Sequence, residues 1–70
     1  MYSDIIRELR ERKGLFQEDI AKILGTTQQQ YSRYENGTEM PYKSLVKLAI
    51  FYNVTTDYIL GLEKRKKTNN

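Results

Sequence analysis

Residues 14–37 constrain this chain of 70 residues most strongly. Helix-forming residues occupy Gln17–Leu24 and Gln28–Glu35, and Gly25 stands between the two stretches. Glycine commonly ends a helix, and Thr27 can cap the helix that follows. The pattern therefore predicts two short helices joined by a tight turn, with the second helix set across the first.

Apolar spacing predicts three further helices. The first is capped by Ser3 and stopped by Gly14, the fourth covers about residues 43–52, and the fifth is short, beginning after Thr55 and ending at Gly61. No stretch shows the sustained alternation of apolar and polar residues that indicates a strand. The predicted fold class is all-α, a compact bundle of five short helices around one core.

Length and charge define the expected organisation. A chain of this size forms one small domain, which we place at residues 1–62. The net charge is +3, but four of the twelve basic residues lie in 64–67, which leaves eight basic against nine acidic residues. Residues 63–70 lack apolar periodicity and are expected to form a disordered basic tail. Such a tail either improves solubility or adds non-specific affinity for phosphate.

Composition excludes several classes of function. The chain has no cysteine and no histidine, so disulfides and thiolate chemistry are absent and no metal site is expected. We find no nucleophile–base pair and no glycine-rich phosphate loop, and therefore expect no enzyme, no cofactor and no small-molecule ligand. The longest apolar run, 48–52, is far shorter than the ~18 residues of a membrane span. Without a signal pattern, a cytoplasmic protein that does not contact membranes is expected.

The helix Gln28–Glu35 is predicted to have two different faces. At about 100° per residue, Tyr31 and Tyr34 fall on one side and are expected in the core. The opposite side carries four side chains that can hydrogen-bond to base edges: Gln28, Gln29, Ser32 and Arg33. Glutamine can pair with adenine and arginine with guanine, and each good pair gives about 1–3 kcal/mol of discrimination. The pattern favours a helix in the major groove of DNA over an ordinary solvated face, although Gln30 is expected to be merely solvated.

The ordered set of motifs resembles the Cro/C1-type helix-turn-helix family of phage and bacterial repressors. The resemblance extends from about residue 6 to residue 61, and segment 25–29 is similar to that of a lambdoid phage repressor. It rests on segments 6–10, 14–15, 17–21, 24–25, 34–37, 48–49 and 54–61, together with Pro41. It implies a lambda repressor-like domain that binds double-stranded DNA in a sequence-specific way as a transcription regulator, a repressor. The rival interpretation is a protein-interaction module, such as an antitoxin or an adaptor of another regulator.

The resemblance also implies roles for individual residues. Base contacts fall to Gln28, Gln29 and Arg33, with Ser32 as a lesser base or phosphate contact. The alternative for Arg33 is that it only neutralises a phosphate. Phosphate contacts fall to Gln17, Thr27, Asn36 and Lys43. Arg10 and Glu35 match a pair that bridges the first and third helices. The family often forms homodimers on palindromic sites, which here would use Tyr58, Ile59 and Leu62 and form mainly on DNA.

Phe16 departs from the family pattern. It stands where relatives usually have a threonine, serine or asparagine that caps the second helix, and the loss of such a cap costs ~1 kcal/mol. One alternative is that Phe16 packs under the first helix. Glu39 likewise stands in a loop where relatives often carry lysine or arginine.

Overall fold

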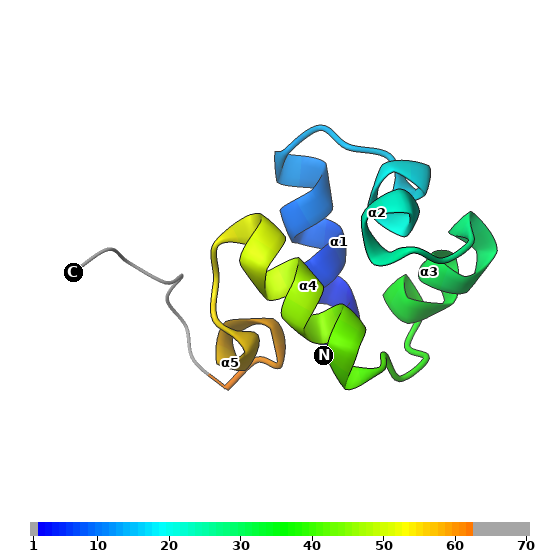
Figure 1. The fold of residues 1–70 in the computed structure, drawn as a ribbon. Coiled ribbons are helices and arrows are strands. Elements are labelled where there is room, and N and C mark those ends of the chain that lie inside the picture. Colours follow the sequence, from blue (N-terminus) through cyan, green and yellow to red (C-terminus); the bar gives the residue numbers. More distant parts are fainter. Residues whose placement is uncertain (1, 63–70) are drawn as a thin grey trace.

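The computed structural model of the chain describes residues 2–62, and these residues form five helices without a strand. In chain order the helices are α1 (Tyr2–Arg12), α2 (Gln17–Leu24), α3 (Gln28–Glu35), α4 (Tyr42–Tyr52) and α5 (Thr56–Ile59) (Figure 1). The predicted all-α fold is therefore confirmed. The expected basic tail, 63–70, lies outside the described residues.

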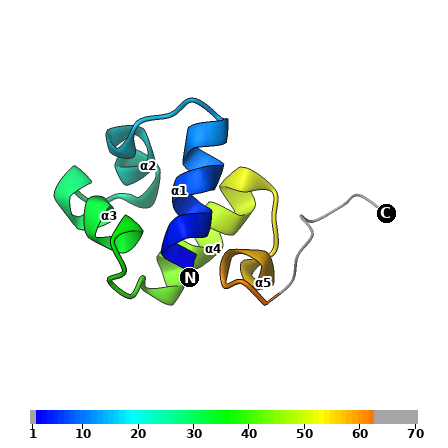
Figure 2. The same ribbon diagram turned by 180° about the vertical axis from the view of Figure 1, so that it is seen from behind.

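The helices surround one core. α2 packs on α3, α1 lies against α3 and α5, and α4 contacts both α2 and α5. Figures 1 and 2 show α3 on the outside of the bundle, at the end opposite α5. Each helix contributes one side chain with no exposed surface to the centre of the core, namely Ile6, Ile20, Tyr31, Leu48 and Ile59. This shared burial fixes how α3 is held on the bundle.

Local capping sets the boundaries of the predicted turn. Gly25 has a φ of +73°, a left-handed conformation that ends α2. The Thr27 hydroxyl accepts a hydrogen bond from the Gln30 backbone N–H at 3.1 Å, so Thr27 caps α3 as predicted. The Thr55 hydroxyl accepts in the same way from the Tyr58 N–H at 2.9 Å and caps α5. These ends depend on neighbouring residues only, which is why the sequence pattern located them.

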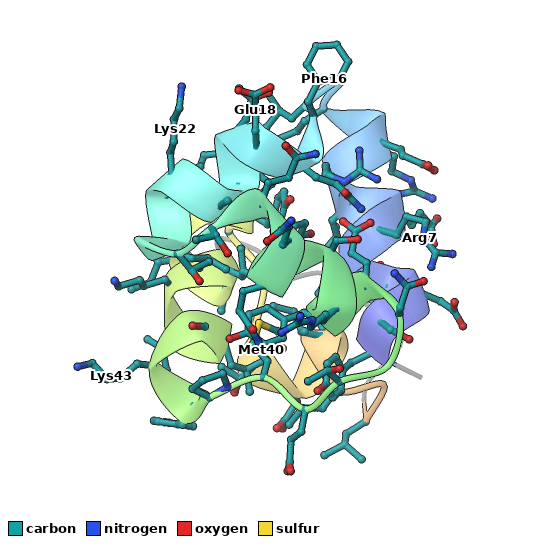
Figure 3. All side chains as sticks on the ribbon, turned by 90° about the vertical axis from the view of Figure 1, so that its right-hand side faces the viewer. Arg7, Phe16, Glu18, Lys22, Met40 and Lys43 are labelled. Carbon is teal, nitrogen blue, oxygen red and sulfur yellow. The ribbon has the colours of Figure 1, made fainter. Side chains whose placement is uncertain are left out.

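The structure corrects one expectation at a helix start and decides an alternative that was open at another. Ser3 does not precede α1 but lies inside it, buried at 6% exposure, because the helix already includes Tyr2. Phe16 does not pack under α1, since its side chain is 72% exposed and its ring projects beyond the bundle (Figure 3). The missing side-chain cap is partly offset, because the Phe16 N–H donates to the Asp19 carboxylate at 2.8 Å.

Candidate nucleic-acid interface

The outward side of α3 borders an open hollow of about 530 Å³. Its lining consists of Gln17 from the first turn of α2 and four residues of α3, namely Gln28, Gln29, Ser32 and Arg33. Gln28, Gln29 and Arg33 are exposed, whereas Gln17 and Ser32 are partly buried. The structure thus brings together the four residues that the sequence placed against bases and one that it placed against a phosphate. Figure 3 shows α3 at the front of this face.

The inward side of α3 is anchored by two aromatic rings. Tyr31 is fully buried and Tyr34 is 5% exposed, and their rings meet edge to face with centroids 6.4 Å apart. Large buried rings in this geometry fix the rotation of a helix about its own axis. That rotation keeps the polar side of α3 turned outward.

A buried carboxylate fastens the end of α3 to α1. The Glu35 side chain is 1% exposed, and Arg10 donates to both of its oxygens, from Nε to Oε2 at 2.7 Å and from Nη2 to Oε1 at 3.0 Å. Arg10 Nη1 also donates to the Leu15 carbonyl at 2.9 Å, which ties the α1–α2 connection to the same guanidinium. The pair expected from the family resemblance therefore forms a two-bonded bridge between α1 and α3.

Three further donors at Glu35 were missed by the sequence analysis. The Tyr31 hydroxyl donates to Oε2, and Gln17 Nε2 donates to Oε1 at 3.1 Å. Arg7 Nη2 donates to the Glu35 backbone carbonyl at 2.7 Å. The spacing of Tyr31 and Glu35, four residues apart on one helix, was a usable signal for the first contact. No comparable signal existed for Gln17 and Arg7, since each lies on another helix.

These contacts determine whether the buried Glu35 carboxyl is ionised. Burial raises the pKa of the Glu35 carboxyl, but the hydrogen bonds from Arg10, Tyr31 and Gln17 lower it further than burial raises it. The net result is a pKa below the ordinary value, so Glu35 is ionised at neutral pH. Burial and the bond to Glu35 raise the pKa of Tyr31 strongly. The cluster is thus a carboxylate surrounded by donors that keep their protons.

The other three residues predicted to contact phosphates lie at helix ends and are not part of the lining of the hollow. Thr27 is exposed at the start of α3, where its hydroxyl serves as the cap. Asn36 follows α3, and its Nδ2 donates to the Ser32 carbonyl at 2.8 Å. Lys43 is exposed at the start of α4 and extends at one edge of the face that α3 occupies (Figure 3). The two ends of α3 and the start of α4 therefore carry polar groups.

Gln30 has a contact that the sequence did not predict. It is partly buried, and its Oε1 accepts a hydrogen bond from Arg33 Nη1 at 3.2 Å. Instead of being merely solvated, Gln30 restrains the guanidinium of a predicted base-contacting residue.

The comparison with protein families identifies this arrangement. Residues 6–59 match the model of the helix-turn-helix family. The chain belongs to the helix-turn-helix family. The predicted resemblance is thereby confirmed, and α2 and α3 are the two helices on either side of the turn at Gly25.

Several helix-turn-helix regulators are similar to the chain. The HTH-type transcriptional regulator YqaE of Bacillus subtilis is 35% identical over 68 residues, which cover 96% of this chain and 59% of that protein. The cryptic phage CTXphi transcriptional repressor RstR of Vibrio cholerae is 42% identical over 55 residues, covering 77% and 50%. The regulator ImmR of Bacillus subtilis is 35% identical over 65 residues, covering 91% and 51%. The chain thus spans only 50–59% of the length of these relatives.

In this helix-turn-helix protein the expected dimer surface needs one correction. Ile59 has no exposed surface and belongs to the core, so it cannot contact a second copy. Tyr58 is partly buried against the core, and Leu62 is 74% exposed. Leu60, which the sequence analysis did not select, is 40% exposed on the same segment. Of the three predicted residues, Leu62 is the most accessible.

Residues 2–62 show neither a metal site nor a membrane-spanning helix. No group of three histidine, cysteine, aspartate or glutamate side chains in this range is arranged to hold a metal ion. No helix of the same range is long and apolar enough to cross a membrane.

Proposed function

We propose that the chain is a sequence-specific regulator of transcription, acting as a repressor, that inserts α3 into the major groove of double-stranded DNA. One observation carries this proposal. Gln28, Gln29 and Arg33 stand exposed around one hollow, while the other side of the same helix is fixed in the core. A rigid helix with amides and a guanidinium on its free side matches the donor and acceptor pattern of base edges.

The residues around α3 would supply the contacts that position it. Gln17 lines the hollow, and Thr27, Asn36 and Lys43 lie at the two ends of α3 and the start of α4, where the walls of a groove would bring phosphates. Gln17 stands at the first position of α2, where backbone N–H groups favour an anion. Phosphate contacts fix register and base contacts specify sequence. The phosphate-contacting residues would therefore position the protein on the DNA, and the base-contacting residues of α3 would select the sequence.

Two copies would be needed for a useful affinity. A single helix of this length touches few base pairs, and related domains bind half-sites about one helical turn apart as symmetric dimers. We propose Tyr58 and Leu62 as the contact between copies, without the buried Ile59. A contact of this size is small, so the dimer is expected to form mainly on DNA.

Selection of bound duplexes from a random pool tests the proposal directly. We expect a palindromic motif, and binding that weakens steeply as salt rises because counterions are released from the phosphates. The double variant Gln28→Ala, Gln29→Ala should lose the preference for the selected site while it keeps the fold and much of the non-specific binding. A pool without an enriched motif, together with binding insensitive to salt, would instead favour the antitoxin or adaptor interpretation.

A further inference from the structure

The side chain of Tyr2 connects the start of α1 to the loop between α3 and α4. Its hydroxyl donates a hydrogen bond to the Thr38 carbonyl at 2.9 Å and accepts one from the Met40 N–H at 2.7 Å. The partners are 36 and 38 residues away in sequence, so these bonds are purely tertiary. One hydroxyl thus satisfies a carbonyl and an N–H of the same loop.

The loop that Tyr2 holds is otherwise attached mainly at its ends. It leaves α3 through Gly37, whose φ of +108° is open to glycine and strained for other residues. The Thr38 N–H returns to the Arg33 carbonyl at 2.9 Å, and the Met40 side chain is buried behind α3 (Figure 3). Between these points, the Tyr2 hydroxyl is the contact that bonds directly to the loop backbone on both sides of residue 39.

The same loop joins two residues that the proposed function assigns to phosphates. Asn36 lies at its beginning and Lys43 follows its end, at the start of α4. α1 also holds the chain just before the loop, because Arg7 Nη2 donates to the Glu35 carbonyl at 2.7 Å. A shift of residues 38–40 would therefore change the spacing between Asn36 and Lys43.

We infer that Tyr2 is a positioning residue for binding to the DNA backbone: its hydroxyl fixes the loop 37–41 and so sets Lys43 and Asn36 at the spacing of the phosphates. This inference rests on the proposed function. Because phosphates carry no sequence information, Tyr2 acts on affinity for every duplex and leaves base preference unchanged. The role differs from that of Arg10 and Glu35, which hold α3 itself.

The variant Tyr2→Phe tests the inference, because it removes one oxygen and keeps the ring. We expect binding to the selected site and to an unrelated duplex to weaken equally, by about three- to tenfold, the equivalent of one neutral hydrogen bond. Tyr52→Phe is the matched control: it removes a buried hydroxyl without a hydrogen-bond partner among residues 2–62, and binding should not change. Amide exchange at Met40 should become faster in Tyr2→Phe and stay slow in the control.

A double-mutant cycle with Lys43→Ala separates positioning from a general loss of stability. If Tyr2 places Lys43, the Lys43→Ala change should weaken binding less in the Tyr2→Phe background than in the wild type. Additive effects, or a Tyr2→Phe protein that binds DNA like the wild type, would overturn the inference and leave the proposed function intact. A wild-type protein that binds no duplex at all would overturn both, so the two failures are distinguishable.

Discussion

The polar groups on the two sides of α3 differ in burial and in hydrogen bonding. On the inward side, both oxygens of Glu35 are bonded, to Arg10, Gln17 and Tyr31, and the side chain is almost fully buried. On the outward side, Gln28 and Gln29 stand exposed at the hollow. The inward groups hold the helix in place, and the outward groups are available to a partner.

The physical basis of this difference is desolvation. A buried charge is tolerated only when its partners replace the lost water, so removing any one of them leaves the others unsatisfied. An exposed amide keeps its water until a binding partner replaces it, so its removal costs the folded protein little. Changes on the inward side should therefore alter stability, and changes on the outward side should alter recognition.

The largest effect is expected for Glu35→Ala on the inward side. It leaves the Arg10 guanidinium, whose side chain is 13% exposed, without its carboxylate, and should lower the free energy of unfolding by about 3–5 kcal/mol. Glu8→Ala is the matched control, because the Glu8–Arg12 pair is more than half exposed and should contribute about 0.5 kcal/mol or less. Urea denaturation of both variants measures the difference. Equal losses would mean that burial does not distinguish the two pairs.

On the outward side, Gln29→Ala should reduce discrimination between the selected site and a site with one changed base pair by about 1–3 kcal/mol, the contribution of one paired base contact. Glu8→Ala is the control, since Glu8 is exposed on α1, outside the lining of the hollow, and should leave discrimination unchanged. Competition binding measures the ratio, and thermal unfolding should be nearly unchanged. A drop in stability with intact discrimination would reverse the assigned roles of the two sides.

Lowering the pH should reduce stability through Glu35, on the inward side of α3. Because folding lowers the pKa of Glu35 from its ordinary 4.5, the unfolded chain takes up a proton first as pH falls. The contribution of Glu35 to the free energy of unfolding should therefore be complete above about pH 5. Below that pH it should decrease, by at most about 1.4 kcal/mol per pH unit. Denaturation at several pH values measures this slope, which should be smaller in Glu35→Gln. The same slope in both proteins would assign the acid sensitivity to other carboxyls.

The smallest effect is expected for Tyr52→Phe. The Tyr52 hydroxyl is buried without a hydrogen-bond partner among residues 2–62, and burial raises its pKa to about 12. Removing an unsatisfied hydroxyl should leave stability at neutral pH unchanged or raise it by about 1 kcal/mol. Above about pH 10 the wild type should lose stability as its unfolded tyrosine ionises first, and the variant should lose less. A clear destabilisation at neutral pH would show that the hydroxyl is satisfied in solution.

Local signals in the sequence predicted the elements but not every contact between them. Gly25, Thr27 and Thr55 act on the backbone of their own neighbours, so the helix ends they define were predicted correctly. Ser3 was misassigned because a serine near a helix start can lie before the helix or within it, and packing placed it within. Ile59 was misassigned to a surface because a helix as short as α5 has too few residues for a distinct apolar stripe.

In the candidate site, too, the sequence predicted the local features and not the long-range contacts. Helical spacing alone placed Gln28, Gln29, Ser32 and Arg33 on one side of α3, and the structure groups them around one hollow. The bonds from Arg7 and Gln17 to Glu35, and from Tyr2 to the loop after α3, were not foreseen. They join residues 18 to 38 positions apart, and no period in the sequence relates such positions.

The order of helices, the turn at Gly25 and the two-sided character of α3 are determined by the sequence itself, because capping and helical periodicity act over a few residues. Tertiary structure decided that Phe16 points outward, that Ile59 is core, and that Tyr2 holds a loop nearly forty residues away. The reason is that burial and long-range hydrogen bonds exist only once the helices have packed, and many packings are compatible with the same local pattern.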